Sequence, residues 1–412
     1  MTHEARQIQT TYLTLQFGNT LAASMIWGIN TLFLLDAGLS NFEAFLANAF
    51  YTLGMVLFEV PTGIVADRFG RRTSYLLGTI ILSLATALYF VLWQTGAPFW
   101  QWAGASLMLG LGYTFFSGAV EAWLVDALQF ARYTGKLEAV FGRGQIVNGI
   151  AMLLGALGGG IIAQFTNLGV PFIVRAGILL VMFAWAWLLM RDIGFTPDRT
   201  ETPLKAIRTL LRVSVARGLG NPPVRWLMLS AIVSSSVGFY AFYALQPHLL
   251  QLYGDKSAYW IAGLAATLVA GAQIAGGLLA AQVASLFAKR TTALIVSTLA
   301  SSIVLASLWL VPNFYVALGL VALWGLLFAA SMPIRQTYLN GMIPSRQRAT
   351  VLSFDSLLSN TGGIVIQPTL GKVADISSYG ASFAVGGVLQ LLALPFLALS
   401  KRANHSADSS PV

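Results

Sequence analysis

Residues 63–94 read GIVADRFGRRTSYLLGTIILSLATALYFVLWQ, a charged stretch followed by an apolar run over residues 73–94. A helix needs about 20 mostly apolar residues to cross the hydrocarbon core of a bilayer. Only structures that satisfy their own backbone hydrogen bonds are tolerated in that core. The run therefore predicts a transmembrane helix that begins just after a polar loop.

Similar apolar runs recur along the whole chain and predict twelve transmembrane helices, six in each half. The composition agrees, because 57% of the 412 residues are apolar and only 9% are charged, against roughly 25% charged in a soluble domain. A water-soluble globular protein is excluded. The first apolar stretch is too long for a signal peptide, so we expect it to be retained. The predicted spans are 12–36, 42–64, 73–94, 99–127, 140–165, 170–191, 225–250, 258–285, 291–311, 314–335, 349–372 and 379–400.

Lysine and arginine are distributed unevenly between the alternating loops. With the N-terminus inside, 21 of the 24 basic residues lie on the inner side, and only Arg175, Lys256 and Lys372 lie outside. Because basic residues resist translocation, this predicts a multi-pass protein of the cell (inner) membrane with both termini in the cytoplasm. The net charge of +9 is then a topology signal, and no nucleic-acid partner is expected.

The longest polar stretch, residues 191–225, divides the chain. We predict an N-terminal six-helix bundle over 1–192, a cytoplasmic linker over 193–224, a C-terminal bundle over 225–402 and a disordered tail over 403–412. An apolar face beside a basic face in the linker predicts an amphipathic helix on the inner leaflet, with a solvated connector as the alternative. The apolar face holds Leu204, Ile207, Leu211 and Val215, and the basic face holds Lys205, Arg208 and Arg212.

A faint internal repeat relates the two halves. FGRRT at 69–73 corresponds to FAKRT at 287–291, and LVD at 124–126 corresponds to YLN at 338–340, with offsets of 218 and 214 residues. Two similar halves in a bilayer predict a fold with one central site that opens to either side.

Residues 63–72, GIVADRFGRR, carry the most specific motif. Glycines at 63 and 70 permit a close helix approach and a tight turn, and Asp67 can satisfy backbone N–H groups or pair with an arginine. The stretch resembles the loop motif G-x-L-A-D-R-x-G-R-R of the major facilitator superfamily, with Val65 in place of leucine.

The resemblance extends over the whole chain and implies an all-α integral membrane fold of twelve helices in two six-helix pseudo-symmetric bundles. It also implies a secondary active transporter that works by alternating access, with this loop as a latch between the inner ends of the halves. An ordinary positively charged turn is the alternative. Asp126 and Arg143 look like a structural pair beside the latch, and Asp355 is placed to receive Arg68 or Arg71. The expected latch residues are Gly63, Asp67, Arg68, Gly70, Arg71, Arg72, Asp126, Arg143 and Asp355.

AMLLGALGGG at 151–160 resembles a weakened form of the superfamily's antiporter motif. Gly155, Gly159 and Gly160 match, but Ala156 replaces the proline. Plain helix packing explains the same small residues equally well, so efflux is only favoured.

Ionisable side chains inside spans are costly and are functional candidates by default. Glu121 in span four and Arg335 in span ten occupy repeat-equivalent positions, 214 residues apart. We predict that they form a pair that opens when Glu121 takes a proton; the alternative is that both snorkel to the inner rim. Glu59 is a second proton-coupling candidate, with neutralisation of Arg143 as its alternative role.

Aromatic and amide residues on spans one, four, seven and ten are expected to line the cavity. Such a wall suits an amphipathic solute better than a sugar or a small anion, although aromatic residues also form interfacial belts. The cavity-lining candidates are Trp27, Asn30, Tyr113, Phe116, Tyr240, Tyr243, Gln246 and Trp324.

The predicted function is proton-coupled efflux of amphipathic or lipophilic small molecules by a monomer. Uptake of a small organic nutrient is the alternative within transport, and a non-transporting signalling or scaffold protein is the alternative from another class. No enzyme motif is found, and no cysteine and only three scattered histidines are present. We therefore expect no catalytic residue, no metal and no cofactor.

Overall fold

The computed structural model describes residues 3–197, 212, 215–343 and 348–409. Within these residues the fold is all-α, and the only β pairing is an isolated bridge between Lys289 and Ser409. Among the described residues, ten helical stretches are long and apolar enough to cross a membrane, and two of these, Phe99–Phe130 and Tyr379–Arg402, contain a short turn. The other two predicted spans, one and eleven, also consist of two helices in succession. The chain thus carries the twelve-span, all-helical fold expected from its hydropathy.

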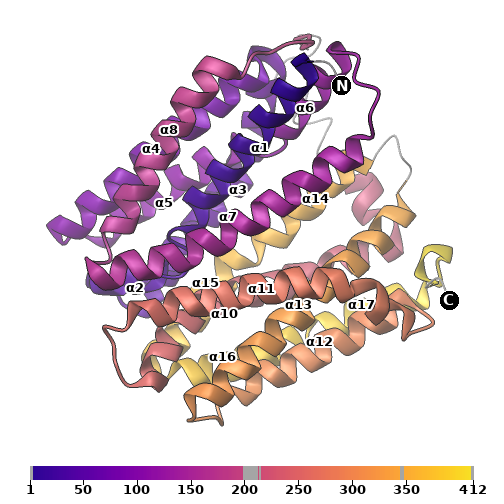
Figure 1. Ribbon diagram of the computed structural model, residues 1–412. Helices are drawn as coiled ribbons and strands as arrows, with labels where there is room; N and C mark the ends of the chain where they lie inside the picture. Colours follow the sequence, from indigo (N-terminus) through magenta and orange to yellow (C-terminus); the bar gives the residue numbers. More distant parts are fainter. Residues whose placement is uncertain (1–2, 198–211, 213–214, 344–347, 410–412) are drawn as a thin grey trace. The chain divides into compact units, whose positions relative to one another are not determined.

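Contacts divide the chain into two compact units. Unit 1 comprises Met1–Gly38 and Phe50–Ile207, and unit 2 comprises Leu39–Ala49 and Arg208–Val412. Residues 39–49, which begin the second span, therefore cluster with unit 2 rather than with the rest of the N-terminal half. Figure 1 shows the elements along the chain, from indigo through magenta and orange to yellow.

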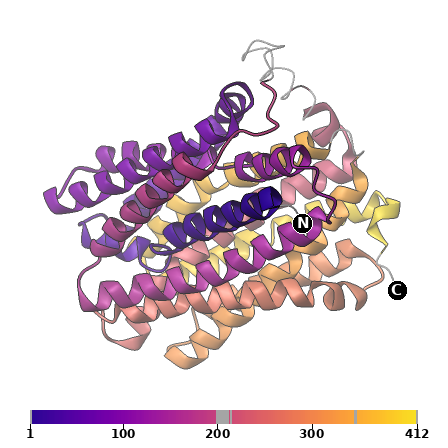
Figure 2. The same cartoon turned by 45° about the horizontal axis from the view of Figure 1, so that its top comes forward.

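The N-terminal half supplies eight helices. They are α1 (His3–Ser24), α2 (Asn30–Asp36), α3 (Asn41–Phe69), α4 (Arg71–Thr95), α5 (Phe99–Thr114), α6 (Ala119–Phe130), α7 (Leu137–Phe165) and α8 (Val170–Leu189). In unit 1, α1 packs along α7, and α4 packs between α5 and α8 (Figures 1 and 2). Leu15, Tyr75 and Trp123 lie in the buried core of this unit.

The C-terminal half is built from the one-turn helix η1 (Val215–Leu219), eight longer helices and the short helix η3. These are α10 (Pro222–Tyr253), α11 (Tyr259–Ser285), α12 (Arg290–Ser307), α13 (Phe314–Met342), α14 (Arg348–Thr361), α15 (Gly363–Ile376), α16 (Tyr379–Gln390), α17 (Ala393–Arg402) and η3 (Ser406–Asp408). In unit 2, α13 packs along α11 and α12, and α10 packs along α17. Leu227, Tyr338 and Val351 are fully buried in its core.

Four predicted spans are interrupted. Span one breaks at residues 25–29 between α1 and α2, and span four breaks at residues 115–118 between α5 and α6. Gly118 ends the second break with φ of +69°, a left-handed conformation that costs glycine little. Spans eleven and twelve break between α14 and α15 and between α16 and α17. Discontinuous membrane helices are a feature of transporter binding sites.

The expected amphipathic linker helix falls largely outside the described residues. Leu204, Ile207, Leu211, Lys205 and Arg208 belong to that part of the chain, whereas Val215 begins η1.

The prediction of a disordered tail is wrong for residues 403–409. Asp408 is buried and accepts hydrogen bonds from the backbone N–H and the hydroxyl of Thr291, both at 2.8 Å. Arg290 donates to the carbonyls of Ala407 and Ser409, at 2.5 and 2.6 Å. The tail is ordered because its carboxylate satisfies N–H and O–H groups at the start of α12.

Candidate functional site

The break in span four brings two carboxylates of unit 1 close to the same turn. Ser117, inside the break, donates its hydroxyl to Glu59 Oε1 at 2.6 Å. Glu121 is the third residue of α6, in the first turn of that helix, where the partial positive charge of a helix N-terminus favours a carboxylate. Tyr113, in the last turn of α5, lies within electrostatic range of both Glu59 and Glu121. The break thus organises the two acidic side chains.

Glu121 also belongs to a polar network that connects α1, α6 and α7. Gln16 Nε2 donates to Glu121 Oε1 at 2.8 Å and lies 3.3 Å from the Tyr12 hydroxyl. Asn148 on α7 donates to Gln16 Oε1 at 3.5 Å and accepts from the Thr20 hydroxyl at 2.9 Å. Tyr12, Gln16 and Thr20 recur every four residues, which places them on one face of α1. We call these five residues the Gln16 network.

Both carboxylates are bound by neutral donors. No lysine or arginine of the described residues forms an ion pair with Glu59 or Glu121. No basic side chain compensates either carboxylate, and charge inside a membrane bundle is costly, so the two side chains remain functional candidates. Glu59 has Ser117 as its partner rather than Arg143, the neutralising role that the sequence left open.

The latch loop is bound within unit 1. Asp67 and Arg71 form an ion pair at 2.5 Å. Gly70 is the N-cap of α4 and has φ of +104°. Arg72 donates a guanidinium N–H to the backbone carbonyl of Trp187 at 2.6 Å. The Arg72 guanidinium also lies 4.8 Å from the centroid of the Trp187 ring. Arg72 thus connects the start of α4 to the end of α8, and Arg71 connects it to the end of α3.

Two further expectations at the latch are wrong. Asp126 and Arg143 do not pair, because Arg143 donates to Gln9 Oε1 at 3.4 Å instead. An added Cβ at Gly63 would meet nothing within 4 Å, so this glycine is not required by a close helix contact.

Arg335 and Asp355 form an ion pair that the sequence did not suggest. Arg335 donates through Nη1 and Nη2 to the two carboxylate oxygens, at 2.8 and 2.6 Å. Both side chains belong to unit 2. Arg335 is thereby neutralised by Asp355, and Glu121 is bound by Gln16. Each side chain thus has a partner within its own unit in place of the expected Glu121–Arg335 pair. Asp355, expected to receive Arg68 or Arg71, has both oxygens bound by Arg335.

Several cavity-lining candidates serve packing instead. Tyr240, Gln246 and Trp324 are buried, with Tyr240 bonded to the Ser382 hydroxyl at 2.5 Å and Trp324 stacked on Phe328. Asn30 is buried at the start of α2, Phe116 contacts the ring of Tyr75, and Tyr243 contacts Phe242.

Trp27 lies half-buried in the break of span one, and Tyr113 is 43% exposed. Tyr113 is thus the candidate that combines exposure with proximity to the acidic pair.

The antiporter-like glycines are contact points between α7 and the end of α1. An added Cβ at Gly155 would lie 2.0 Å from the Ser24 hydroxyl oxygen, and one at Gly159 would lie 1.8 Å from the Met25 carbonyl oxygen. Gly160 is buried beside them. Close packing of small residues accounts for this motif.

Two aspartates that the sequence analysis missed occupy equivalent places in the repeat. Asp192, after α8, accepts the backbone N–H of Arg72 at the start of α4, at 2.9 Å. Asp408, after α17, accepts the backbone N–H of Thr291 at the start of α12, at 2.8 Å. Each aspartate follows the sixth span of its half in the chain and caps the N-terminus of the helix that forms the third span of that half. The correspondence of FGRRT with FAKRT is the signal that pointed to these helix starts.

A sequence model of the Major Facilitator Superfamily matches residues 12–281 and 259–411. The chain belongs to the Major Facilitator Superfamily. It is a multi-pass integral membrane protein of that superfamily, and its two-unit, all-helical architecture is the expected one.

Relatives within the superfamily differ in how much they share with this chain. The uncharacterized transporter YxaM of Bacillus subtilis is 23% identical over 394 residues, which cover 90% of this chain and 89% of YxaM. The class B tetracycline resistance protein of Escherichia coli is 29% identical over 158 residues, which cover 37% of this chain and 36% of that protein. ZINC INDUCED FACILITATOR 1 of Arabidopsis thaliana is 30% identical over 124 residues, 30% of this chain and 24% of its own length.

Solved structures of superfamily transporters share the fold. The nucleoside transporter NupG aligns with a TM-score of 0.76 at 13% identity, covering 97% of this chain and 99% of NupG. A bacterial homolog of the human lysosomal transporter Spinster aligns with the same TM-score at 16% identity, over 100% of both chains. At these identities the likeness concerns the fold alone.

Proposed function

We propose that this transporter couples the export of amphipathic or lipophilic small molecules to proton entry, and that Glu121 carries the proton. The observation that supports the proposal is the pair of carboxylates at the break of span four, each bound by a neutral donor (Gln16 to Glu121, Ser117 to Glu59). A protonated Glu121 can donate a hydrogen bond as well as accept one. The Gln16 network would then have to rearrange and would transmit the change to α1 and α7.

Two observations favour efflux of a lipophilic solute over nutrient uptake. Tyr113 presents a partly exposed aromatic ring within electrostatic range of Glu59 and Glu121, and aromatic walls with few polar groups suit amphipathic ligands. A partial relative is a tetracycline resistance protein. We place the protein in the cell inner membrane with both termini in the cytoplasm, on the basis of its basic inner loops.

The test uses the full-length protein reconstituted in liposomes with an imposed proton gradient. Tetracycline and ethidium are the probes, and solute-driven proton movement is followed with a pH-sensitive dye. Glu121→Gln keeps the size of the side chain and removes its charge. We expect gradient-driven transport to fall at least about tenfold, while exchange of labelled for unlabelled probe without a gradient persists.

Asp255→Asn is the matched control, because Asp255 is an exposed acid in the loop between α10 and α11. Its transport should stay at the unmodified level. Proton movement that is unaltered in Glu121→Gln would remove Glu121 as the proton carrier. Accumulation of the probes against the predicted direction would establish uptake instead.

A further inference from the structure

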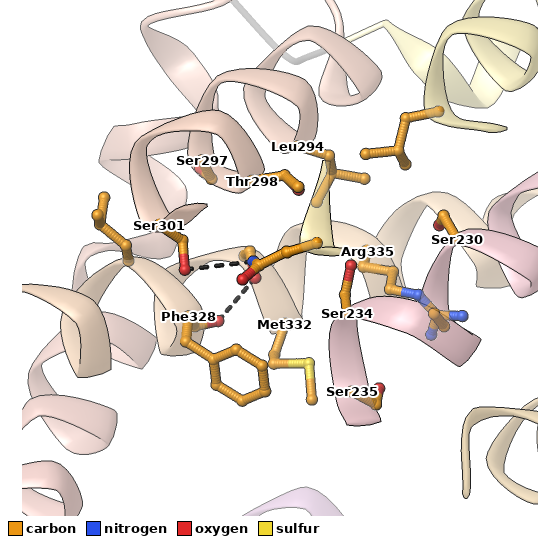
Figure 3. A pocket seen from close by; sticks show the side chains of 15 residues that line it. Ser230, Ser234, Ser235, Leu294, Ser297, Thr298, Ser301, Phe328, Met332 and Arg335 are labelled. Carbon is orange, nitrogen blue, oxygen red and sulfur yellow. Dashed lines mark hydrogen bonds between the residues drawn. The ribbon is translucent and has the colours of Figure 1, made fainter. Parts of the chain in front are cut away.

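A small pocket with several hydroxyl groups in its lining lies inside unit 2. Its walls come from α10, α12, α13, α16 and α17 (Figure 3). The centre of a water molecule can occupy about 50 Å³ of it. None of the eight cavity-lining candidates from the sequence contributes to it. The polar lining consists of Ser230, Ser234, Ser235, Ser297, Thr298, Ser301, Ser331, Arg335 and Gln390.

Part of this lining is satisfied within the protein. The hydroxyls of Ser230 and Ser331 each donate to a carbonyl one turn earlier in their own helix, both at 2.7 Å. Ser301 accepts from Gln390 Nε2 at 3.3 Å. These bonds hold the pocket walls in shape and leave the remaining hydroxyls to face the space between the helices.

The other four hydroxyls, on Ser234, Ser235, Ser297 and Thr298, have no hydrogen-bond partner among the described residues. An unsatisfied polar group inside a membrane bundle costs about 1–3 kcal/mol, so an occupant that bonds to these hydroxyls stabilises the pocket. Figure 3 shows the hydroxyls of α12 and α10 on opposite sides of one pocket. Four unpaired hydroxyls around one space indicate a polar occupant.

The size and charge of the pocket restrict that occupant. Arg335 lines the pocket, but its charge is cancelled by Asp355 at 2.6 Å, so the wall offers no net charge to an ion. A water needs roughly 10–15 Å³ of such space, so the pocket holds about three to five waters. A drug-sized solute does not fit.

We propose that this pocket holds a water cluster that hydrates Arg335, so that the Arg335–Asp355 ion pair borders an aqueous recess instead of a dry bundle interior. Separating a dry buried pair leaves an uncompensated charge and costs about 3–5 kcal/mol. Water and serine hydroxyls offer Arg335 alternative acceptors and lower that cost. The pair is then able to open and re-form as unit 2 changes shape, whatever the transported solute is.

Radiolytic hydroxyl-radical labelling of the full-length protein in lipid nanodiscs tests this directly, because radicals form from water beside the side chain that they label. Met332 lines the pocket and is 40% exposed, whereas Met228 is fully buried in the core of the same unit. We expect Met332 to be oxidised and Met228 to be spared, and the substitutions below show how much of the oxidation comes from pocket water. No oxidation of Met332 would show that the pocket is dry or filled by an acyl chain.

Two substitutions on α12 distinguish water in the pocket from water elsewhere around the protein. Successive residues turn by 100° around a helix, so Leu299 lies opposite the face of Ser297 and Ser301, and it is 43% exposed. Ser297→Leu fills the pocket and should reduce Met332 oxidation by about threefold or more, as expected when the waters are displaced. Leu299→Phe should leave it unaltered. Oxidation that survives Ser297→Leu would overturn the proposal.

Should Ser297→Leu fail to fold, single cysteines provide the same comparison. The chain has no cysteine, so Ser297→Cys and Leu299→Cys each carry one thiol at nearly the same depth. Reaction with iodoacetamide requires the thiolate, which apolar surroundings suppress. Ser297→Cys should react on the order of tenfold faster if its surroundings are aqueous. Equal rates would contradict a hydrated pocket.

Discussion

Asp355 binds Arg335 through both of its carboxylate oxygens, and this ion pair connects α14 to α13 inside unit 2. The side chains are 9% and 16% exposed, respectively, so neither charge is well solvated by bulk water. Each depends on the other for compensation. Loss of one partner should therefore change the stability of the protein differently from loss of both.

Replacing Asp355 alone with leucine should lower the free energy of unfolding, because Arg335 loses the carboxylate that compensates its charge. Water in the adjacent pocket should keep the loss below the value of about 3–5 kcal/mol for a dry buried pair. The double variant Arg335→Met/Asp355→Leu should recover most of that loss, since two apolar side chains of similar size pack without a desolvation penalty. Thermal unfolding of the purified protein in detergent measures both. A double variant less stable than the single one would show that the pair contributes a net attraction.

Removing the carboxylate of Asp408 should release the tail from α12. Asp408→Asn retains one acceptor oxygen and places an amide against Thr291, so we expect a loss of about 1–3 kcal/mol. Proteolysis with a protease that cleaves after Lys401 or Arg402 should become faster, because the released segment can adopt the extended conformation that a protease binds. Asp255→Asn serves as the control, since Asp255 bonds only within its own turn. Unchanged proteolysis would mean that the tail stays docked without its carboxylate.

Asp192 predicts a pH dependence with a definite sign. Burial raises the pKa of this carboxyl above its ordinary value of 3.8, against the opposing effect of Arg72 and Arg71. The folded chain therefore binds the proton more readily than the unfolded chain, and the ionised carboxyl costs stability at neutral pH. That cost disappears as the pH falls through the raised pKa toward 3.8. The measurement is the melting temperature of the unmodified protein and of Asp192→Asn from pH 7 to pH 4. As the pH falls, the melting temperature of the unmodified protein should rise relative to that of Asp192→Asn.

Asp255 should show the opposite trend and serves as the internal comparison. Hydrogen bonds from the Ser257 hydroxyl and backbone lower the pKa of Asp255, so its contribution is present at neutral pH and is lost as the pH falls. If Asp192→Asn and Asp255→Asn gave the same pH trend, the assignment of the acid response to burial of Asp192 would be wrong.

Gly159 and Gly158 are neighbours on α7 with opposite tolerance to a methyl group. A Cβ at Gly159 would lie 1.8 Å from the Met25 carbonyl oxygen, whereas one at Gly158 would meet nothing within 4 Å. Gly159→Ala should therefore destabilise the protein by about 1–3 kcal/mol through overpacking. Gly158→Ala should be neutral or slightly stabilising, because alanine favours the helix. Melting temperatures and the yield of monodisperse protein check this pair, and equal tolerance would refute the close contact of α7 with the break of span one.

Hydropathy and charge predicted the positions of the spans because lipid imposes length and apolarity on every crossing segment. The helices α3, α4 and α7 begin and end within a few residues of the predicted runs. The breaks in spans one and four were missed, since a run such as residues 25–29, MIWGI, is as apolar as an unbroken helix. Only Gly28 and Gly118 hint at them.

The sequence predicted the acidic residues of the candidate site but not the neutral residues that bind them. Glu59 and Glu121 were identified because charge inside a span is rare. Gln16 and Ser117 carry no such signal, and their importance depends on which helices pack together. Asp408 was assigned to disorder because its short polar segment has no periodicity, whereas its order depends on a helix start more than a hundred residues away.

The interrupted spans have a mechanical implication. In the first half the helix breaks fall in the first and fourth spans, whereas in the second half they fall in the last two. The breaks therefore do not follow the internal repeat. A mechanism that treats the two halves as interchangeable rigid arms does not fit these helices, because the first half is interrupted beside its acidic groups and the second half near its C-terminal end.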